Sequence, residues 1–312
     1  MQFREALHLV ENKQTEVPSD REDSFETLLQ IDYEYYRSCY ADLQGMEEED
    51  LRAHYRRHGY WEGRVAHPLA TREGFMAALP MVPCLEIGPF TTPALSGSHV
   101  RYADILSTGE LQQRAEVLEF DKQNVPEIHF VLEHGDLKGI DERFDLVFSS
   151  HCIEHQPNLI GHLRDVAALL TARGKYAVII PDARFCFDAH LPLSCISEVL
   201  QAHHEDRRVH SMASFIQHSA LTTHNVAQSH WAENIAIGDR SWKMIEPNRL
   251  KAAIDSWDLS LGYSDVHAWQ FQPLSFSDIV GALITLDLVP FKKIECHATV
   301  SGQLEFTATL SL

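Results

Sequence analysis

The feature that most constrains the fold of this chain is a regular alternation of short apolar segments with helical segments between residues 82 and 180. Such apolar runs are typical of strands covered by helices on both faces, and the alternation indicates a parallel sheet. The five predicted strands are Val82–Ile87, Val100–Asp104, His129–Leu132, Phe144–Ser149 and Lys175–Ile180. Near the end of the chain, two apolar segments around Ser301 and Gly302 predict an antiparallel hairpin, Phe291–Thr299 with Leu304–Leu310. We therefore expect an α/β fold with seven strands in one sheet.

Helical signals fill the connections between these strands. Ser107 and Glu110 form a capping box before a helix that extends through Glu119, and residues 157–170 have helical periodicity. The segment after the fifth strand, 182–267, is too long for a simple connection and contains predicted helices at 193–204, 211–220 and 247–257. Because open parallel sheets bind ligands outside the carboxyl ends of their strands, we expect this insertion to form a lid over that edge.

The first 68 residues predict a small helical module and linker, ahead of a main domain over residues 69–312. Tyr33, Tyr35, Tyr36 and Tyr40 crowd its centre, and a helix over residues 47–58 ends at a glycine. We expect these aromatic side chains to build a small core.

The charge of the chain argues against nucleic-acid partners. Its 312 residues carry a formal net charge of −19 at pH 7, which would repel a polyanion. No run of about 18 apolar residues is present and Met1–Glu16 is too polar for a signal peptide, so we expect a cytoplasmic protein without a membrane span. Six cysteines without a C-x-x-C pair favour buried free thiols over a zinc knuckle or a disulfide framework.

Two residue patterns follow the first two predicted strands. Glu86 lies near the end of the first strand, and Gly88 follows where a glycine lets the backbone approach a ligand. Pro89 and Phe90 stand where a dinucleotide-binding loop would have further glycines, so no pyrophosphate cradle is predicted. Asp104 ends the second strand, where a carboxylate can accept hydrogen bonds from both hydroxyls of a ribose.

Two further patterns follow the third and fourth predicted strands. The third strand leads into His134-Gly135-Asp136-Leu137. The fourth lies in residues 144–155, which read FDLVFSSHCIEH and end in Glu154 and His155. A proline and an asparagine then open the next helix.

In order and spacing, these four patterns resemble the signature segments of class I S-adenosylmethionine-dependent methyltransferases. The resemblance implies a methyltransferase with a Rossmann-like seven-stranded sheet and S-adenosyl-L-methionine as cofactor. It places Asp104 on the ribose, Asp136 near the adenine, and Glu86 with Gly88 near the methionine end. The full set of cofactor residues that it implies is Glu86, Gly88, Pro89, Asp104, Ile105, Asp136, Leu137, Ser149, Ser150 and His151.

Three other segments resemble proteins of bacterial O-antigen and capsule loci. Residues 31–68 are similar to a short Tyr-rich module of bacterial glycosyltransferases, whereas 176–190 (YAVIIPDARFCFDAH) and 264–280 (SDVHAWQFQPLSFSDIV) are similar to methyltransferases of such loci. The resemblance implies O-methylation of a sugar hydroxyl in a bacterial surface polysaccharide or its precursor, with a glycosyltransferase partner for the module. The alternatives are methylation of a small metabolite or an amino-sugar nitrogen, and a non-catalytic adaptor in a glycan-assembly complex.

A sugar hydroxyl is a poor nucleophile at neutral pH, so a base must take its proton during methyl transfer. The candidate bases are His151, His155, Asp182, His224, His230 and His267. We favour a histidine supplied by the lid. A divalent ion could instead acidify the hydroxyl, with Asp182, Asp188, His230 and Glu233 as ligands. The sequence has no dense acidic cluster, however, and we predict no metal site.

Overall fold

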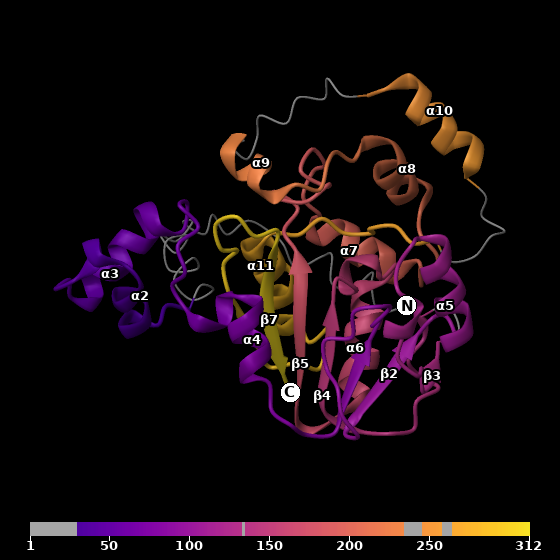
Figure 1. Ribbon diagram of the computed structural model, residues 1–312, viewed down its shortest axis with the longest axis horizontal. Helices are drawn as coiled ribbons and strands as arrows, with labels where there is room; N and C mark the ends of the chain where they lie inside the picture. Colours follow the sequence, from indigo (N-terminus) through magenta and orange to yellow (C-terminus); the bar gives the residue numbers. More distant parts are fainter. Residues whose placement is uncertain (1–29, 133–134, 234–244, 258–263) are drawn as a thin grey trace, which may run out of the picture.

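The computed structural model describes residues 30–132, 135–233, 245–257 and 264–312. At its centre is one seven-stranded sheet with helices on both faces (Figure 1). The strands are β1 (Cys84–Ile87), β2 (Val100–Asp104), β3 (Phe130–Val131), β4 (Phe144–Ser150), β5 (Leu170–Pro181), β6 (Lys293–Cys296) and β7 (Glu305–Ser311). Their order across the sheet is β3-β2-β1-β4-β5-β7-β6.

The pairing directions agree with the predicted topology. The first five strands pair in parallel, whereas β7 is antiparallel to both β5 and β6. A parallel sheet closed by a hairpin whose last strand lies between its partner and β5 is the arrangement of the class I methyltransferase fold. The predicted fold class is therefore confirmed.

Most strands differ in length from the prediction: β1, β3 and β6 are shorter, β4 and β5 are longer, and β2 has the predicted bounds. β5 begins at Leu170, because α6 (Leu159–Leu169) ends there and Leu170 pairs directly with Phe144 of β4. A shift of register between Phe144 and Leu146 absorbs the additional residues. β3 has only two residues, Phe130 and Val131, although the predicted end residues His129 and Leu132 also donate backbone hydrogen bonds to β2 at 2.9 and 2.8 Å.

The helices bury apolar side chains against the two faces of the sheet. α6, α7 (Ile196–His204) and α11 (Pro273–Thr285) form the largest core cluster with one face, where Leu163, Val199 and Phe276 are fully buried. α4 (Arg72–Ala78) covers the other face through Phe75. α5 (Thr108–Val117) begins at the predicted capping box of Ser107 and Glu110. These helices leave the carboxyl ends of β1, β2 and β4 to face the connections that follow them.

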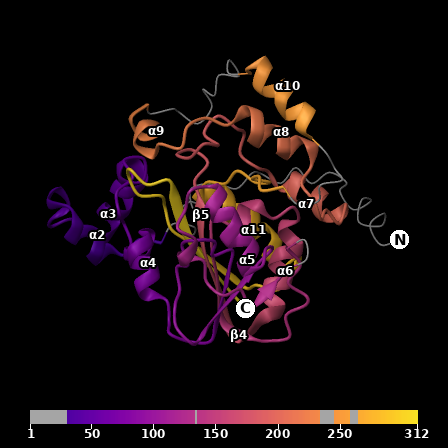
Figure 2. The ribbon, with the colours of Figure 1, turned by 45° about the vertical axis from the view of Figure 1, so that its right-hand side comes forward.

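Three further helices form a cap above the carboxyl ends of the parallel strands. The cap consists of α8 (Met212–Leu221), α9 (Ala227–Glu233) and α10 (Pro247–Ser256), and Figures 1 and 2 show all three on the same side of the sheet. This arrangement confirms a helical insertion after β5, of which residues 234–244 and 258–263 lie outside the described part. The first helix of the insertion, α7, is not part of the cap. It packs on α6, because its Val199 and Ala202 are buried in the main core.

The N-terminal module consists of short helices around a small aromatic core, as predicted. Its elements are α2 (Tyr33–Cys39), η2 (Ala41–Leu43), α3 (Glu48–His54) and η3 (Tyr55–Gly59). The next element, η4 (Pro68–Ala70), packs through Leu69 in the core cluster of Phe75. The rings of Tyr36 and Tyr55 meet edge to face at 5.3 Å. The same core includes Ala298, and Ser301 N donates to Gly63 O at 2.7 Å. The module therefore packs directly on the β6–β7 hairpin. Residues 1–29 lie outside the described part.

The described helices are each too short or too polar to cross a bilayer. The six cysteines are free, and Cys84, Cys186 and Cys296 are buried as expected. Cys39 and Cys195 are exposed, because they lie at the end of α2 and just before α7.

Candidate active site

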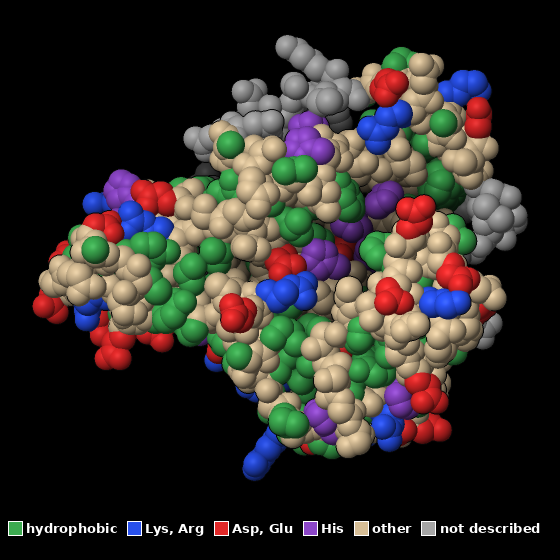
Figure 3. All heavy atoms as spheres, in the orientation of Figure 1, with side chains coloured by type: hydrophobic (Ala, Val, Ile, Leu, Met, Phe, Trp, Pro, Cys, Tyr) green, Lys and Arg blue, Asp and Glu red, His purple; other side chains and the backbone are tan. Residues whose placement is uncertain are grey.

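A cavity of about 320 Å³ lies at the carboxyl ends of β1, β2 and β4. Its volume falls within the range of small-molecule sites, roughly 300–1,000 Å³. Figure 3 shows the molecule hollowed on this face, with histidine side chains gathered along the hollow. The apolar part of its wall is formed by Ile87, Phe90, Ile105, Leu106, Leu111 and Leu132. The predicted edge of the sheet therefore does carry a concave site.

The turn after β1 brings the backbone to the cavity. Gly88 has a φ of +72°, a conformation that side chains other than glycine rarely adopt, and it lines the cavity. Phe90 follows with a φ of 42° and also lines the cavity. Pro89 is buried between them, where its carbonyl accepts a hydrogen bond from Thr92 N at 3.0 Å. Pro89 thus shapes the turn from behind.

Glu86 holds the loop that follows β1 and is not among the residues that line the cavity. Its two carboxylate oxygens accept hydrogen bonds from Ala94 N at 2.8 Å and Leu95 N at 2.9 Å. Burial raises the pKa of Glu86 to about 7, even though these two hydrogen bonds favour its charged form. Glu86 therefore fixes the loop at Ala94 and Leu95, and its predicted place near the methionine end stays a prediction.

Asp104 places a carboxylate in the cavity at the end of β2. Its side chain is 8% exposed, and Oδ1 accepts a hydrogen bond from Leu106 N at 3.1 Å. Burial raises the pKa of Asp104 to about 6. A ligand that donates hydrogen bonds to this carboxylate would stabilise its charged form. Ile105, predicted beside it, lines the cavity as well.

Arg114 of α5 and Asp265 close one side of the cavity. Their side chains form an ion pair, and both residues line the cavity. Since the guanidinium already has a carboxylate partner, it is not arranged as a phosphate-binding group. Hydrogen bonding to His155, helped by Arg114, holds the pKa of Asp265 well below its usual range.

The segment after β3 contributes Gly135 and Leu137 to the cavity wall, as predicted for Leu137. Asp136 lies instead in an adjoining cavity of about 750 Å³, and its Oδ1 accepts a hydrogen bond from Lys138 N at 2.9 Å. His134 lies outside the described residues.

Three predicted cofactor residues, Ser149, Ser150 and His151, lie at the end of β4, and His151 is the one that lines the cavity. The Ser149 hydroxyl lies 2.8 Å from the Tyr176 hydroxyl inside the core, and Ser150 Oγ accepts from Arg72 at 2.7 Å. His151 lines the cavity with a φ of 50°, and its Nε2 lies 2.7 Å from Glu305 Oε2. Burial would raise the pKa of Glu305, but hydrogen bonds from His151 and Arg72 lower it to about 2.

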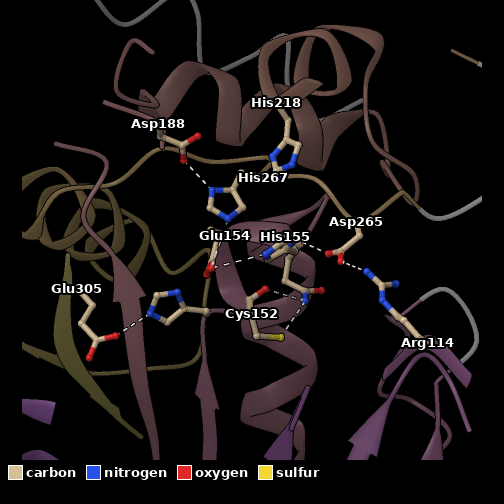
Figure 4. A network of polar contacts seen from close by, with 11 residues as sticks. Arg114, Cys152, Glu154, His155, Asp188, His218, Asp265, His267 and Glu305 are labelled. Atoms are coloured by element: carbon tan, nitrogen blue, oxygen red, sulfur yellow. Dashed lines mark hydrogen bonds and ion pairs between the residues drawn. The ribbon is translucent and has the colours of Figure 1, made fainter. Parts of the chain in front are cut away.

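Glu154 is the most unusual polar residue near the cavity. Its side chain is 1% exposed, and neither carboxylate oxygen has a hydrogen-bond partner in the part of the chain that the structure describes. His155 Nε2 and His267 Nε2 lie 3.7 and 3.8 Å from the same oxygen, Oε1, which is too far for a hydrogen bond. Figure 4 shows both imidazoles directed toward this carboxylate.

Each of these two histidines has a second carboxylate on its other nitrogen. His267 Nδ1 lies 2.6 Å from Asp188 Oδ2, and both residues are buried. His155 Nδ1 lies 3.1 Å from Asp265 Oδ1, and His155 lines the cavity. Burial alone would lower the pKa of His155, but Asp265 and the neighbouring carboxylates raise it. We call Glu154, His155, His267 and Asp188 the buried polar cluster; Asp265, whose side chain is exposed, lies at its edge.

Backbone hydrogen bonds fix the two chain segments that carry this cluster. Glu154 O accepts from Ala268 N at 2.7 Å and from Trp269 N at 3.1 Å. The indole of Trp269 donates to Gln156 O at 2.6 Å. The segment at His267 is therefore tied directly onto η7 (Ile153–His155) after β4.

The other predicted bases lie away from the cavity lining. Asp182 is fully buried, where it pairs with Arg184 at 2.6 Å and accepts from Thr299 Oγ1 at 2.6 Å. His224 and His230 stack on each other at 4.1 Å, and His230 Nε2 donates to His224 O at 3.0 Å. These contacts make Asp182 part of the packing of the segment 176–190. His230 lies within α9, and His224 lies just before it.

The cavity also uses residues that the sequence did not single out for it. Phe90, Leu106, Leu111, Arg114, Cys152, Gln156 and Asp265 line it, and Glu154 lies just behind. Glu154 belonged to the recognised end of the β4 pattern, so that signal was present. Asp265 had no local signal, because its partners Arg114 and His155 are distant in the sequence.

The sequence matches no protein-family model and no curated protein. Among solved structures, the CurJ carbon methyltransferase is 12% identical, with a TM-score of 0.37 over 77% of this chain and 51% of that one. The CcbJ methyltransferase from Streptomyces caelestis is 20% identical, with a TM-score of 0.26 over 36% of this chain and 50% of that one. An S-adenosylmethionine-dependent methyltransferase from Clostridium acetobutylicum is 14% identical, with a TM-score of 0.25 over 36% and 47%.

This chain thus spans about half the length of the solved structures that it matches. The TM-scores of these matches are low. The fold is therefore assigned from the order and directions of the strands.

Proposed function

We propose that this chain is an S-adenosylmethionine-dependent methyltransferase. The observation that carries the proposal is the pairing of Gly88 and Asp104 at one cavity, at the carboxyl ends of adjacent strands of a methyltransferase-type sheet. In such sheets, ligands bind at the carboxyl ends of the strands.

The residues of the cavity fit this cofactor. Asp104 is a buried carboxylate that two ribose hydroxyls would satisfy, and the Gly88 turn leaves backbone open to the methionine end. Leu106, Leu132 and Leu137 offer an apolar wall for an adenine ring. Among the described residues that line the cavity, Arg114 is the one arginine or lysine, and its pairing with Asp265 leaves it poorly placed for the phosphates of a dinucleotide.

We further propose that the methyl group goes to a hydroxyl oxygen. The bound cofactor supplies an electrophilic methyl group on a sulfonium centre. A hydroxyl acceptor must lose its proton as its oxygen bonds to that carbon, so the protein has to provide groups that receive the proton or acidify the hydroxyl. The buried polar cluster, with His155 exposed to the cavity, is suited to that task.

We propose a sugar of a bacterial surface polysaccharide, or its activated precursor, as the acceptor. The Tyr-rich module and the segments at 176–190 and 264–280 support this proposal, because they resemble parts of surface-glycan enzymes. In the structure, these segments pack together: Arg184 lies 5.8 Å over the Tyr60 ring, and His267 approaches Asp188. A glycosyltransferase that docks on the module is the proposed partner.

The test is a methyl-transfer screen. The protein is incubated with S-adenosylmethionine labelled in its methyl group and a library of glycans and nucleotide sugars, and products are read by mass spectrometry. We expect one labelled methyl group on a sugar oxygen. Label on a nitrogen or on a non-sugar metabolite would overturn the acceptor class, and binding without transfer to any acceptor would favour the adaptor role.

A further inference from the structure

The buried polar cluster contains a geometry that proton transfer alone does not explain. Glu154, His155 and His267 each offer one ligand atom, and these three atoms lie within 4.8 Å of one another. Among the described residues, the carboxylate of Glu154 has no hydrogen-bond partner, although its side chain is only 1% exposed. An uncompensated carboxylate in such a place is costly, so the structure calls for a cation at this point.

We propose that Glu154, His155 and His267 bind a divalent transition-metal cation, for which Zn²⁺ is the probe. Two imidazoles and one carboxylate, with further positions open, are a ligand set found in catalytic zinc sites and in other divalent-metal sites. Metal–ligand bonds of about 2.1 Å give ligand–ligand separations of about 3.4 Å in a tetrahedral site. The separations of 3.7 and 3.8 Å from Glu154 Oε1 are close to this value.

The partners of the two histidines support the same conclusion. Metal-binding histidines usually donate their second N–H to a carboxylate, which fixes the ring and the tautomer. Here Asp188 holds Nδ1 of His267 and Asp265 lies beside Nδ1 of His155, so each ring is positioned to present Nε2 to the cation. Figure 4 shows this arrangement from Asp188 through the two rings to Asp265.

The charge of the cluster also fits a divalent cation. Glu154 and Asp188 of the cluster and Asp265 at its edge are carboxylates, and Arg114 forms an ion pair with Asp265. With neutral imidazoles, these groups carry a formal charge of −2, which one divalent cation would neutralise. Because His155 lines the cavity, the open positions of the cation would face the acceptor.

This inference rests in part on the proposed function, to which it adds how the acceptor is held. An oxygen bound to such a cation is more acidic, so a sugar hydroxyl at this position would lose its proton more readily. The binding of the metal itself requires neither the cofactor nor an acceptor, and can therefore be tested alone.

The experiment uses the full chain after treatment with a chelator and dialysis. Calorimetric titration with Zn²⁺ should show one equivalent bound by the wild type. Glu154→Gln and His267→Ala should each weaken that binding by at least 100-fold. The matched control, His58→Ala, removes an exposed histidine of η3 and should bind Zn²⁺ as the wild type does. Equal binding by wild type, Glu154→Gln and His267→Ala would overturn the site, as would the absence of binding to the wild type.

A measurement on the unmodified protein covers the case in which a variant does not fold. Titration with Co²⁺ should produce the visible absorption of a four- or five-coordinate ion with nitrogen ligands, and Zn²⁺ should abolish it. Absence of that spectrum would contradict the proposal. Thermal shift with S-adenosylhomocysteine is recorded on the same samples. A thermal shift with S-adenosylhomocysteine but no metal binding would contradict the metal site and support the proposed function. Metal binding without a thermal shift would support the metal site and contradict the proposed function.

Discussion

The two walls of the cavity are built in different ways. The wall at β1, β2 and α5 is mostly apolar, with Asp104 as its carboxylate and a glycine turn beside it. The wall at the end of β4 is backed by the buried polar cluster, in which Glu154 accepts no hydrogen bond from any residue that the structure describes. The first wall has the features of a surface that binds an adenosyl group. The second wall contains several charged groups that binding of an adenosyl group does not require.

The origin of the residues differs as well. Gly88 and Asp104 directly follow or end strands that pair with each other, so sheet geometry alone brings them together. His267 and Asp188 are 79 residues apart in the sequence. His155, which follows β4, lies beside Asp265, which is near the end of the insertion. The difference suggests a division of work between cofactor binding at the first wall and acceptor chemistry at the second.

The largest effect is expected from Glu154→Gln, which should lower turnover by roughly 10²–10⁴-fold. The substitution keeps the shape of the side chain and removes the charge on which both histidines converge. Affinity for S-adenosylhomocysteine should stay within about twofold of the wild type. Steady-state kinetics with the identified acceptor and calorimetry check the two parts. A parallel loss of cofactor affinity would show that the two walls are not separate in function.

Asp104→Ala should act on the other wall. Loss of charge-assisted hydrogen bonds to the ribose is expected to cost on the order of 2–4 kcal/mol of cofactor binding, or about 30- to 1,000-fold in Kd. Calorimetry with S-adenosylhomocysteine measures it, with the exposed Asp141→Ala as control. Unchanged affinity in the Asp104 variant would mean that the ribose lies elsewhere.

Glu86→Gln should change how stability depends on pH. The pKa of Glu86 is raised from 4.5 to about 7 in the folded chain, so the unfolded chain releases this proton at lower pH than the folded one. Its contribution to the free energy of unfolding therefore falls as pH rises from about 4.5 to about 7, by at most about 3 kcal/mol.

Urea unfolding of the wild type and Glu86→Gln across this pH range measures the difference. The stability of the variant relative to the wild type should rise with pH up to about 7 and then level off. The exposed Glu127→Gln is the control and should follow the wild type. A difference between Glu86→Gln and the wild type that does not vary with pH would contradict the assigned burial of this carboxyl group.

The smallest effect is expected from Tyr36→Phe in the N-terminal module. The Tyr36 hydroxyl lies 3.0 Å from His54 Nδ1, and loss of that hydrogen bond should reduce stability by about 1 kcal/mol. Urea unfolding measures this change. Cofactor affinity should not change, because neither residue lines the cavity. A variant that unfolds normally but loses cofactor affinity would link the module to the first wall.

The sheet and the first wall could be predicted because their signals are local. Apolar runs located the strands, and the order of segments predicted the closing hairpin. Asp104 and Leu137, which the resemblance assigns to the cofactor, line the cavity, and their roles stay predictions. The pattern could not show that Glu86 turns to the Ala94 and Leu95 backbone, since this depends on the path of the loop.

The second wall could be predicted only in part. Glu154 and His155 belonged to a recognised motif, and His267 was a candidate base. Their convergence depends on hydrogen bonds from Ala268 and Trp269 to Glu154 O, which a linear pattern does not reveal. The preference for a base from the lid drew attention to His224 and His230, which the structure instead stacks on each other by α9. Their role as bases stays a prediction.

Calorimetric titration of the full chain with S-adenosylhomocysteine tests the central claim, that the cavity at Gly88 and Asp104 binds an adenosyl cofactor. The account predicts saturable binding of one equivalent, which also raises the Tm of the protein. Absence of both heat and thermal shift, in a sample that unfolds cooperatively, would contradict it.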